Sequence, residues 1–294
     1  MRLKLLVLII FLLDAYFLLN NIAISKPIEE VDDSIPKIFK PGIISSKYYE
    51  FGGMLSPNGD TFYFTRRKNY NGFDNKIYCC KIINGVWQNP EPAFFSSSSC
   101  EMLPYFAPDG KRIYYYSEER NTILNENNIR FVEFEKGEWS LPKKLDIFNN
   151  VKGIMNVSST LLGTLYYNGI SKNSKGIFRS VHNNGTYEKP EFLDTIINKY
   201  YPAHPFIAPD ESYIIFDSQK SGRGNSKIYI SFKNKKGYWS EPKNIGEIIN
   251  KTGTEFAGSI SFDGKYFLFH RRENNNGDIY IINAKMILGD LNEK

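Results

Sequence analysis

One pattern recurs along most of this 294-residue chain, and it constrains the fold more than any other feature. A tight turn leads into a short aromatic strand, and the clearest copies contain Pro57, Pro108, Pro209 and Phe262. These positions are 51, 101 and 53 residues apart, so the middle interval spans two periods. A degenerate copy is therefore expected near residue 160, where Leu-Gly-Thr-Leu-Tyr-Tyr occupies residues 162–167.

A second sequence feature, a strand that begins with isoleucine, recurs with the same period. About 20 residues after each turn a strand begins with isoleucine, at Ile77, Ile129, Ile177, Ile228 and Ile279. The first four copies continue to an aromatic residue and, three positions later, a proline. The aromatic residues are Trp87, Trp139, Tyr187 and Trp239, and their intervals of 52, 48 and 52 residues agree with the turns. We expect these four aromatic side chains to pack within the repeats, because each has the same register.

Each period holds about four short strands: one before the turn, one after it, one beginning with isoleucine and one beginning at the aromatic residue. Four antiparallel strands in about 50 residues is typical of a propeller blade. In the turns, proline fixes φ, aspartate caps the turn and glycine accepts a positive φ. Runs such as Phe62-Tyr63-Phe64 leave both faces of a strand apolar, as a blade between two neighbours requires. The 22 Phe and 20 Tyr of the chain lie mostly in such runs.

The two ends of the repeat region complete one another. The fifth copy stops after 279–282 without an aromatic-x-x-proline strand, whereas the segment 36–45 lies where such a strand would precede the first turn. The sequence therefore predicts an all-β, five-bladed β-propeller of four-stranded antiparallel blades, with the ring closed by an N-terminal strand. The repeats account for residues 36–287, and we assign 36–294 to this single domain.

The turn motif resembles that of a known family. Ala-Pro-Asp-Gly-Lys at 107–111, followed by Ile-Tyr-Tyr and preceded by Glu101, is similar to the WD40-like (PD40) repeat of TolB-type propellers. Four of the five turns carry the motif, while the third blade lacks both Pro and Asp. TolB-type domains usually have six blades, so a count of five departs from the type. The resemblance implies the fold, and it implies a role as a binding platform, a gating domain or an accessory domain.

The N-terminus has the features of a targeting segment. Arg2 and Lys4 precede an apolar run that Asp14 interrupts, and Ala23-Ile24-Ser25 offers a cleavage pattern. We interpret residues 1–25 as a signal peptide, or alternatively as an uncleaved membrane anchor, and 26–35 as a leader. We therefore expect export to the periplasm, the cell surface or the medium, with membrane contact only through 1–25.

Cysteines, net charge and catalytic motifs exclude several classes of function. Of the three cysteines, Cys79 and Cys80 are adjacent in a strand and point to opposite faces; one of them could pair with Cys100, or all could be free. A formal charge of +5 without a run of like charges does not favour nucleic acid. No serine-hydrolase elbow, zinc motif, Walker A or kinase motif occurs, so we predict no cofactor and no metal. Asparagine-rich hairpins at 69–75 and 274–278 could offer oxygen ligands to calcium, but turn chemistry explains them equally well.

Strand direction brings charged residues to one end of the ring. The first strand of each blade begins near a position seven residues before the turn proline, and the second strand ends beside that point. We call this end the charged face and the end with the repeated turns the turn face. The candidate ligand-binding residues are Glu50, Arg66, Glu101, Arg120, Tyr201, His204, Asp217, Glu255 and Arg271. The three glutamates occupy equivalent positions, so they could instead be structural and pair with backbone or with an arginine of the adjacent blade.

Two functions follow from this arrangement. The first is a non-catalytic platform that binds a protein or glycan partner through the charged face. The second is a glycoside hydrolase, in which Glu101 with Asp217 or Glu255 forms a pair of carboxylates near the axis. The two differ in whether carboxylates face an open axial pocket.

Overall fold

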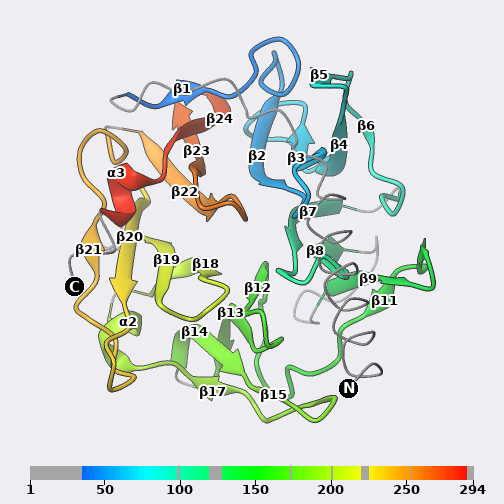
Figure 1. Ribbon diagram of the computed structural model, residues 1–294. Coiled ribbons are helices and arrows are strands. Elements are labelled where there is room, and N and C mark those ends of the chain that lie inside the picture. The colour runs from blue at the N-terminus through cyan, green and yellow to red at the C-terminus, as the bar shows by residue number, and fades with distance from the viewer. Residues whose placement is uncertain are drawn as a thin grey trace, which may run out of the picture.

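The computed structural model describes residues 35–97, 100–118, 128–172, 174–199, 201–219, 225–251 and 253–289. Five antiparallel sheets stand around a central axis as the five blades of a propeller (Figure 1). The predicted signal segment at 1–25, all but the last residue of the leader, and the candidate Arg120 lie outside the described residues. Those interpretations stay predictions.

Each blade follows chain order from the axis outward. Blade 1 contains β2 (Tyr49–Leu55), β3 (Thr61–Arg67), β4 (Lys76–Ile83), β5 (Val86–Trp87) and β6 (Glu91–Pro92). Blade 2 contains β7 (Cys100–Phe106), β8 (Arg112–Glu118), β9 (Ile129–Glu135), β10 (Glu138–Trp139) and β11 (Lys143–Lys144). Blade 3 contains β12 (Val157–Ser159), β13 (Leu165–Ser171), β14 (Ser174–Ser180) and β17 (Glu191–Phe192), with a separate hairpin of β15 (His182–Asn183) and β16 (Thr186–Tyr187).

Blade 4 contains β18 (Ala203–Ile207), β19 (Tyr213–Ser218), β20 (Lys227–Phe232) and β21 (Lys243–Asn244). Blade 5 contains β22 (Thr254–Ile260), β23 (Tyr266–Glu273), β24 (Asn276–Asn283) and, from the other end of the chain, β1 (Lys37–Ile38). Two short helices, α2 (Thr195–Asn198) and α3 (Lys285–Leu288), complete the described elements. Within the described ranges, neither helix approaches the length and apolar content needed to span a bilayer.

The predicted ring closure is confirmed. Strand β1 pairs antiparallel with β24, with Lys37 opposite Ile281, so the last blade is completed by the N-terminal segment (Figure 1). Phe39 anchors this closure: its side chain is 1% exposed and its ring centre lies 4.8 Å from that of Phe62 in blade 1. Closure removes two sheet edges that would otherwise be free to pair with other chains.

The repeated turn keeps one hydrogen bond in all five blades. The N–H four positions into each turn donates to the carbonyl three residues earlier, at 2.8–3.0 Å. The donors are Gly59, Gly110, Gly163, Glu211 and Gly264. The degenerate third copy predicted near residue 160 therefore forms the same turn, with Gly163 at φ 87°. Its missing proline and aspartate do not prevent this turn from forming.

Alternation along the strands builds the contacts between blades. Tyr63 packs with Phe95 and Phe106 on the side of blade 2, while Phe62 and Phe64 pack toward the other neighbour, blade 5. Because successive side chains of a strand point to opposite faces, one aromatic run serves two interfaces. The core therefore lies between the blades, as the sequence predicts.

The outer edge differs from the predicted strand. The aromatic residue belongs to a short extension hairpin, as in the pairing of Trp87 with Ile82, and the strand on the blade body resumes only after the proline, at Glu91–Pro92 in blade 1. Proline has no N–H to donate to a ladder, so the chain leaves the sheet there. The predicted packing role of the aromatic residues is confirmed, because all four contact buried apolar clusters.

The three cysteines are free, which leaves one of the two alternatives. Cys79 packs in the core shared with blade 2, and Cys80 packs in the cluster shared with blade 5, as expected for adjacent residues of one strand. Burial raises the pKa of both thiols, which makes them poor nucleophiles. They act as small apolar side chains.

Candidate functional site

The innermost strands of four blades share an irregularity that shapes the axis. A β-bulge interrupts the pairing of β2, β7, β18 and β22 with the next strand. One residue of each bulge has a positive φ: Gly52 at 60°, Leu103 at 56°, His204 at 45° and Ala257 at 51°. A positive φ is uncommon for residues other than glycine, so the surrounding ring must hold these backbones in place. All four residues line the axis.

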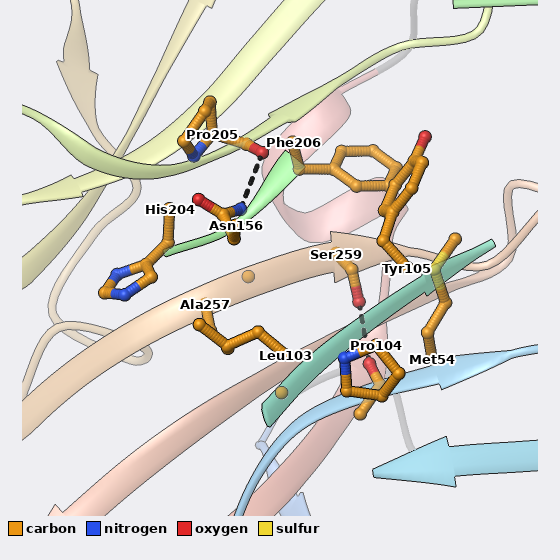
Figure 2. A pocket seen from close by; sticks show the side chains of 13 residues that line it. Met54, Leu103, Pro104, Tyr105, Asn156, His204, Pro205, Phe206, Ala257 and Ser259 are labelled. Carbon is orange, nitrogen blue, oxygen red and sulfur yellow. Dashed lines mark hydrogen bonds between the residues drawn. The ribbon is translucent and has the colours of Figure 1, made fainter. Parts of the chain in front are cut away.

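A small cavity of about 40 Å³ lies among these strands (Figure 2). All five blades contribute to it, through segments 52–54, 103–105, 204–206 and 257–259 and through Asn156. A volume of this size holds a few water molecules at most, and a sugar ring does not fit. Its polar side chains include His204, Asn156 and Ser259, and none of the described residues that line it is an aspartate or glutamate.

Asn156 and Ser259 both bond to the backbone of a neighbouring blade. Asn156 donates from Nδ2 to the carbonyl of Pro205 at 3.3 Å, and Ser259 donates from Oγ to the carbonyl of Gly53 at 3.1 Å (Figure 2). The Oδ1 atom of Asn156 is buried and has no hydrogen-bond partner. The wall of the cavity therefore ties the blades together and leaves one acceptor unused.

One position of the second strand bonds three of the blades to the next blade. Thr65 accepts a hydrogen bond from the N–H of Leu103 at 2.9 Å, and Asp217, at the equivalent position of blade 4, accepts from the N–H of Ala257 at 3.2 Å. In both cases the donor is the residue of positive φ in the following blade. His270 holds the same position in blade 5 and bonds to the carbonyl of Glu50 in blade 1. These contacts explain how the bulges are held.

Asp217 also holds His204. The Nδ1 atom of His204 lies 2.8 Å from Oδ1 of Asp217, while the hydroxyl of Ser226 donates to Oδ2 at 3.0 Å. Since an ionised carboxylate can only accept, Nδ1 carries the proton and Nε2 is the atom that titrates. Burial alone lowers the pKa of His204, but the carboxylate of Asp217 outweighs burial, and the net shift is upward. The two predicted candidates therefore form one pair beside the cavity, in which Asp217 is buried and His204 is partly buried.

The three repeated glutamates are enclosed by structural partners. Glu50 is 0% exposed, accepts from the side chain of Arg66 at 2.8 Å and from the hydroxyl of Ser46 at 2.6 Å. Glu101 is 1% exposed and accepts from the hydroxyl of Ser96 at 2.6 Å and from the backbone and hydroxyl of Ser97.

The third glutamate, Glu255, is 0% exposed and lies 2.7 Å from Lys227 of blade 4 and 3.4 Å from Arg271. The arginines come from the same blade as their glutamates, because each stands directly opposite in the ladder. The alternative of an arginine from the adjacent blade is wrong in this detail, although blade 4 does contribute Lys227.

The two arginines also fasten the loops that precede their blades. Arg66 donates to the carbonyls of Ile43 and Ile44, and Arg271 donates to those of Ile248 and Ile249. Arg66 is half-buried and Arg271 is 3% exposed. Tyr201, another candidate among the described residues, is 66% exposed beside the start of β18.

Two further arginines on the charged face were not among the candidates. Arg67 and Arg272 follow Arg66 and Arg271 in the chain and occupy equivalent positions of the adjacent blades 1 and 5. The guanidinium carbons of both lie over the ring of Tyr70, at 5.8 and 4.3 Å from its centre. The alternation of side chains along a strand could have distinguished Arg67 and Arg272 from Arg66 and Arg271, because of these four only Arg66 and Arg271 stand opposite a glutamate.

Other potential sites receive no support from the geometry. Within the described ranges, no group of three or more His, Cys, Asp or Glu side chains is arranged to hold a metal ion. The hairpin at 69–75 is closed by its own bonds, such as Asn69 Oδ1 to the N–H of Asn71 at 3.0 Å, which is turn chemistry.

No protein-family model and no curated protein matches the chain. Among solved structures, it is similar to TolB from Acinetobacter baumannii, with 18% identity and a TM-score of 0.52. That match covers 83% of this chain and 54% of TolB, so the chain spans about half the length of that protein.

Two enzyme propellers are similar to the same degree. A glycosyl hydrolase from Bacteroides ovatus matches with a TM-score of 0.52 and 9% identity, over 90% of this chain and 92% of that one. An α-L-arabinofuranosidase from Lactobacillus brevis matches with a TM-score of 0.50 and 12% identity, over 87% and 93%. At such identities the likeness is one of fold, and it includes both TolB and glycosidases.

Proposed function

We propose that this protein is an exported, non-catalytic propeller of the WD40-like, TolB type that binds a protein or glycan partner through its charged face. The observation that carries the proposal is the state of the inner carboxylates. Glu50, Glu101, Glu255 and Asp217 are each at most 4% exposed and each is bonded to structural partners. A glycosidase needs one carboxyl group to donate a proton and another to attack or to activate water, both facing the substrate.

Accessible aromatic side chains on the charged face support the binding role. Tyr201 is 66% exposed, and Phe73, in the loop between β3 and β4, is 90% exposed. Aromatic side chains supply large contact areas at low entropic cost and are common in the centre of binding sites. Loops on a rigid scaffold are the usual location of such sites.

The test uses the full chain with a C-terminal affinity tag on arrays of glycans and peptides. The variant Tyr201→Asn/Phe73→Asn removes two exposed side chains from the charged face, and asparagine tolerates the positive φ of 52° at position 201. The matched control is Tyr238→Asn/Leu162→Asn, which removes side chains of 64% and 83% exposure, Leu162 from a turn-face loop and Tyr238 from the outer hairpin of blade 4.

We expect capture of the array ligand to fall about tenfold or more in the charged-face variant and to stay unchanged in the control. Equal loss in both variants, or loss only in the control, would reject the charged face. Release of free sugar from any arrayed glycan would instead establish the glycoside hydrolase alternative.

A further inference from the structure

Arg67 and Arg272 differ in their ion pairing from four other described arginines. Arg66, Arg112, Arg179 and Arg271 each lie within 3.4 Å of a glutamate oxygen. Among the residues that the structure describes, no carboxylate forms an ion pair with Arg67 or Arg272. A partly buried cation is normally paired, because removing it from water without a partner costs free energy.

The contacts of Arg67 leave part of its guanidinium unsatisfied. Its Nη1 donates to the carbonyl of Gly72 at 3.3 Å, and its carbon lies 4.4 Å from the ring centre of Tyr49. Its Nε is buried and has no hydrogen-bond partner. Arg272 donates from Nη2 to the hydroxyl of Thr254 at 3.1 Å and stacks on Tyr70. Both groups are therefore fixed in place by aromatic rings and neutral acceptors, with donors to spare.

The positive charge of the two arginines also acts on two neighbouring groups, Tyr49 and His270. Both arginines act against the burial that raises the pKa of the Tyr49 hydroxyl, and both contribute to the low pKa of His270. Tyr70, whose ring both guanidiniums contact, is 39% exposed, so solvent reaches the site. Of the described carboxylates in the same two blades, Asp74 accepts from the N–H of Lys68 at 3.3 Å and Asp278 accepts from the side chain of Asn276 at 3.0 Å.

We propose that Arg67 and Arg272, whose guanidiniums both lie over the ring of Tyr70, form a binding site for an oxyanion: the carboxylate, phosphate or sulfate group of a ligand on the charged face. A guanidinium donates two parallel hydrogen bonds to such a group, and two guanidiniums held by stacking lose little entropy on binding it. This inference specifies which chemical group of a ligand the charged face binds, and it rests on the proposed binding function.

Isothermal titration of the full chain with sodium glucuronate, inorganic phosphate and sodium sulfate tests the site, with sodium chloride at matched ionic strength as the blank. Arg272→Gln and Arg67→Lys are the site variants. Arg179→Gln is the matched control, because Arg179 of blade 3 is paired with Glu191. Circular dichroism establishes that each variant is folded, and Arg272→Gln keeps the test decisive if Arg67→Lys does not fold.

We expect saturable binding of at least one oxyanion, weakened about tenfold or more by each site variant and unchanged by Arg179→Gln. Preference for glucuronate over phosphate and sulfate identifies an acidic sugar or other carboxylate as the source, and the opposite preference identifies a phosphate or sulfate ester. Absence of saturable binding in the parent protein, or equal binding by Arg272→Gln, would overturn the proposal.

The array experiment separates this outcome from failure of the proposed function. Array binding that depends on Tyr201 and Phe73 but not on Arg272 leaves the binding face standing and removes the oxyanion site. Oxyanion binding without any array ligand that depends on Tyr201 and Phe73 rejects the proposed platform and leaves an isolated anion site.

Discussion

The imidazole of His204 lies 2.8 Å from the carboxylate of Asp217, and this one carboxylate also accepts the backbone N–H of Ala257 in the next blade. The pair thus joins a residue of positive φ in blade 4 to the equivalent residue in blade 5. In blade 1 the neutral Thr65 performs the corresponding task for Leu103. Blade 4 therefore has a titratable contact, beside the axial cavity, at the position where blade 1 has a neutral one.

We expect the His204–Asp217 pair to make the free energy of unfolding depend on pH above the ordinary histidine pKa of about 6.5. The pKa of His204 is above its ordinary value in the folded protein, since Asp217 outweighs the effect of burial. The stabilisation is therefore fully present below the unfolded-state pKa, about 6.5, and is lost as pH rises through the folded-state value. We expect urea unfolding to show a larger stability difference between the parent and His204→Asn at pH 5.5 than at pH 9. Nuclear magnetic resonance titration of His204 provides the direct check, and a folded-state pKa at or below 6.5 would contradict it.

His270 is expected to produce the opposite dependence. Its ring is 0% exposed, with Nε2 2.9 Å from the hydroxyl of Tyr49 and Nδ1 2.8 Å from the carbonyl of Glu50. Burial lowers its pKa to about 3, with Arg67 and Arg272 adding to the effect. A histidine whose pKa is lower in the folded protein contributes stability above about pH 6.5, and this contribution is lost as pH falls toward the folded-state pKa.

The measurement is the free energy of unfolding from pH 7 to pH 4, in the parent and in His270→Gln. We expect the parent to lose stability steadily over this range and the variant to lose less, from a lower starting value. An identical pH slope in the two proteins would show that His270 does not carry the acid sensitivity.

Much of the fold follows from the sequence, because the repeat fixes strand number, order and direction together. The turn and the isoleucine landmarks give the blade count, and the missing outer strand of the fifth repeat predicts that 36–45 closes the ring. The extension hairpins at Trp87 and its equivalents do not follow, since a pattern of apolar residues does not show where proline breaks a ladder. The left-handed φ of Leu103 and Ala257 is also invisible in sequence, because nothing in those side chains requires it.

The candidate site was harder to predict, and the reason lies in neighbouring residues of one strand. Position along the chain brings both Arg66 and Arg67 to the charged face, but cross-strand register decides which one pairs. Glu50 stands opposite Arg66 and pairs with it, so no carboxylate of the described residues pairs with Arg67. If each glutamate had been paired with the arginine opposite it in its own blade, Arg67 and Arg272 would have stood out in the sequence as the remaining arginines.

Removal of a buried glutamate charge should destabilise the ring rather than change ligand binding. Glu255→Gln leaves Arg271, which is 3% exposed, and Lys227 without their carboxylate. Breaking a buried ion pair from one side costs about 3 kcal/mol or more, because the remaining charge stays out of water. The control is Glu91→Gln: Glu91 and its partner Lys81 are more than half exposed, and we expect a change below about 1 kcal/mol. Denaturant unfolding measures both, and equal losses would remove the structural role assigned to Glu255.

Closure of the ring should depend on Phe39. This side chain, 1% exposed, packs on Phe62 at 4.8 Å and on Trp87 at 5.3 Å between ring centres, and so joins the N-terminal segment to blade 1 as well as blade 5. Phe39→Ala leaves a cavity among these rings, and truncation of a buried phenylalanine costs about 3–5 kcal/mol. Ile38→Ala, at the preceding residue in β1 and 39% exposed, is the matched control and should cost far less. The free energy of unfolding measures the difference, and hydrogen exchange of the β24 amides localises it. If Phe39→Ala leaves both unchanged, the N-terminal strand does not hold the ring closed.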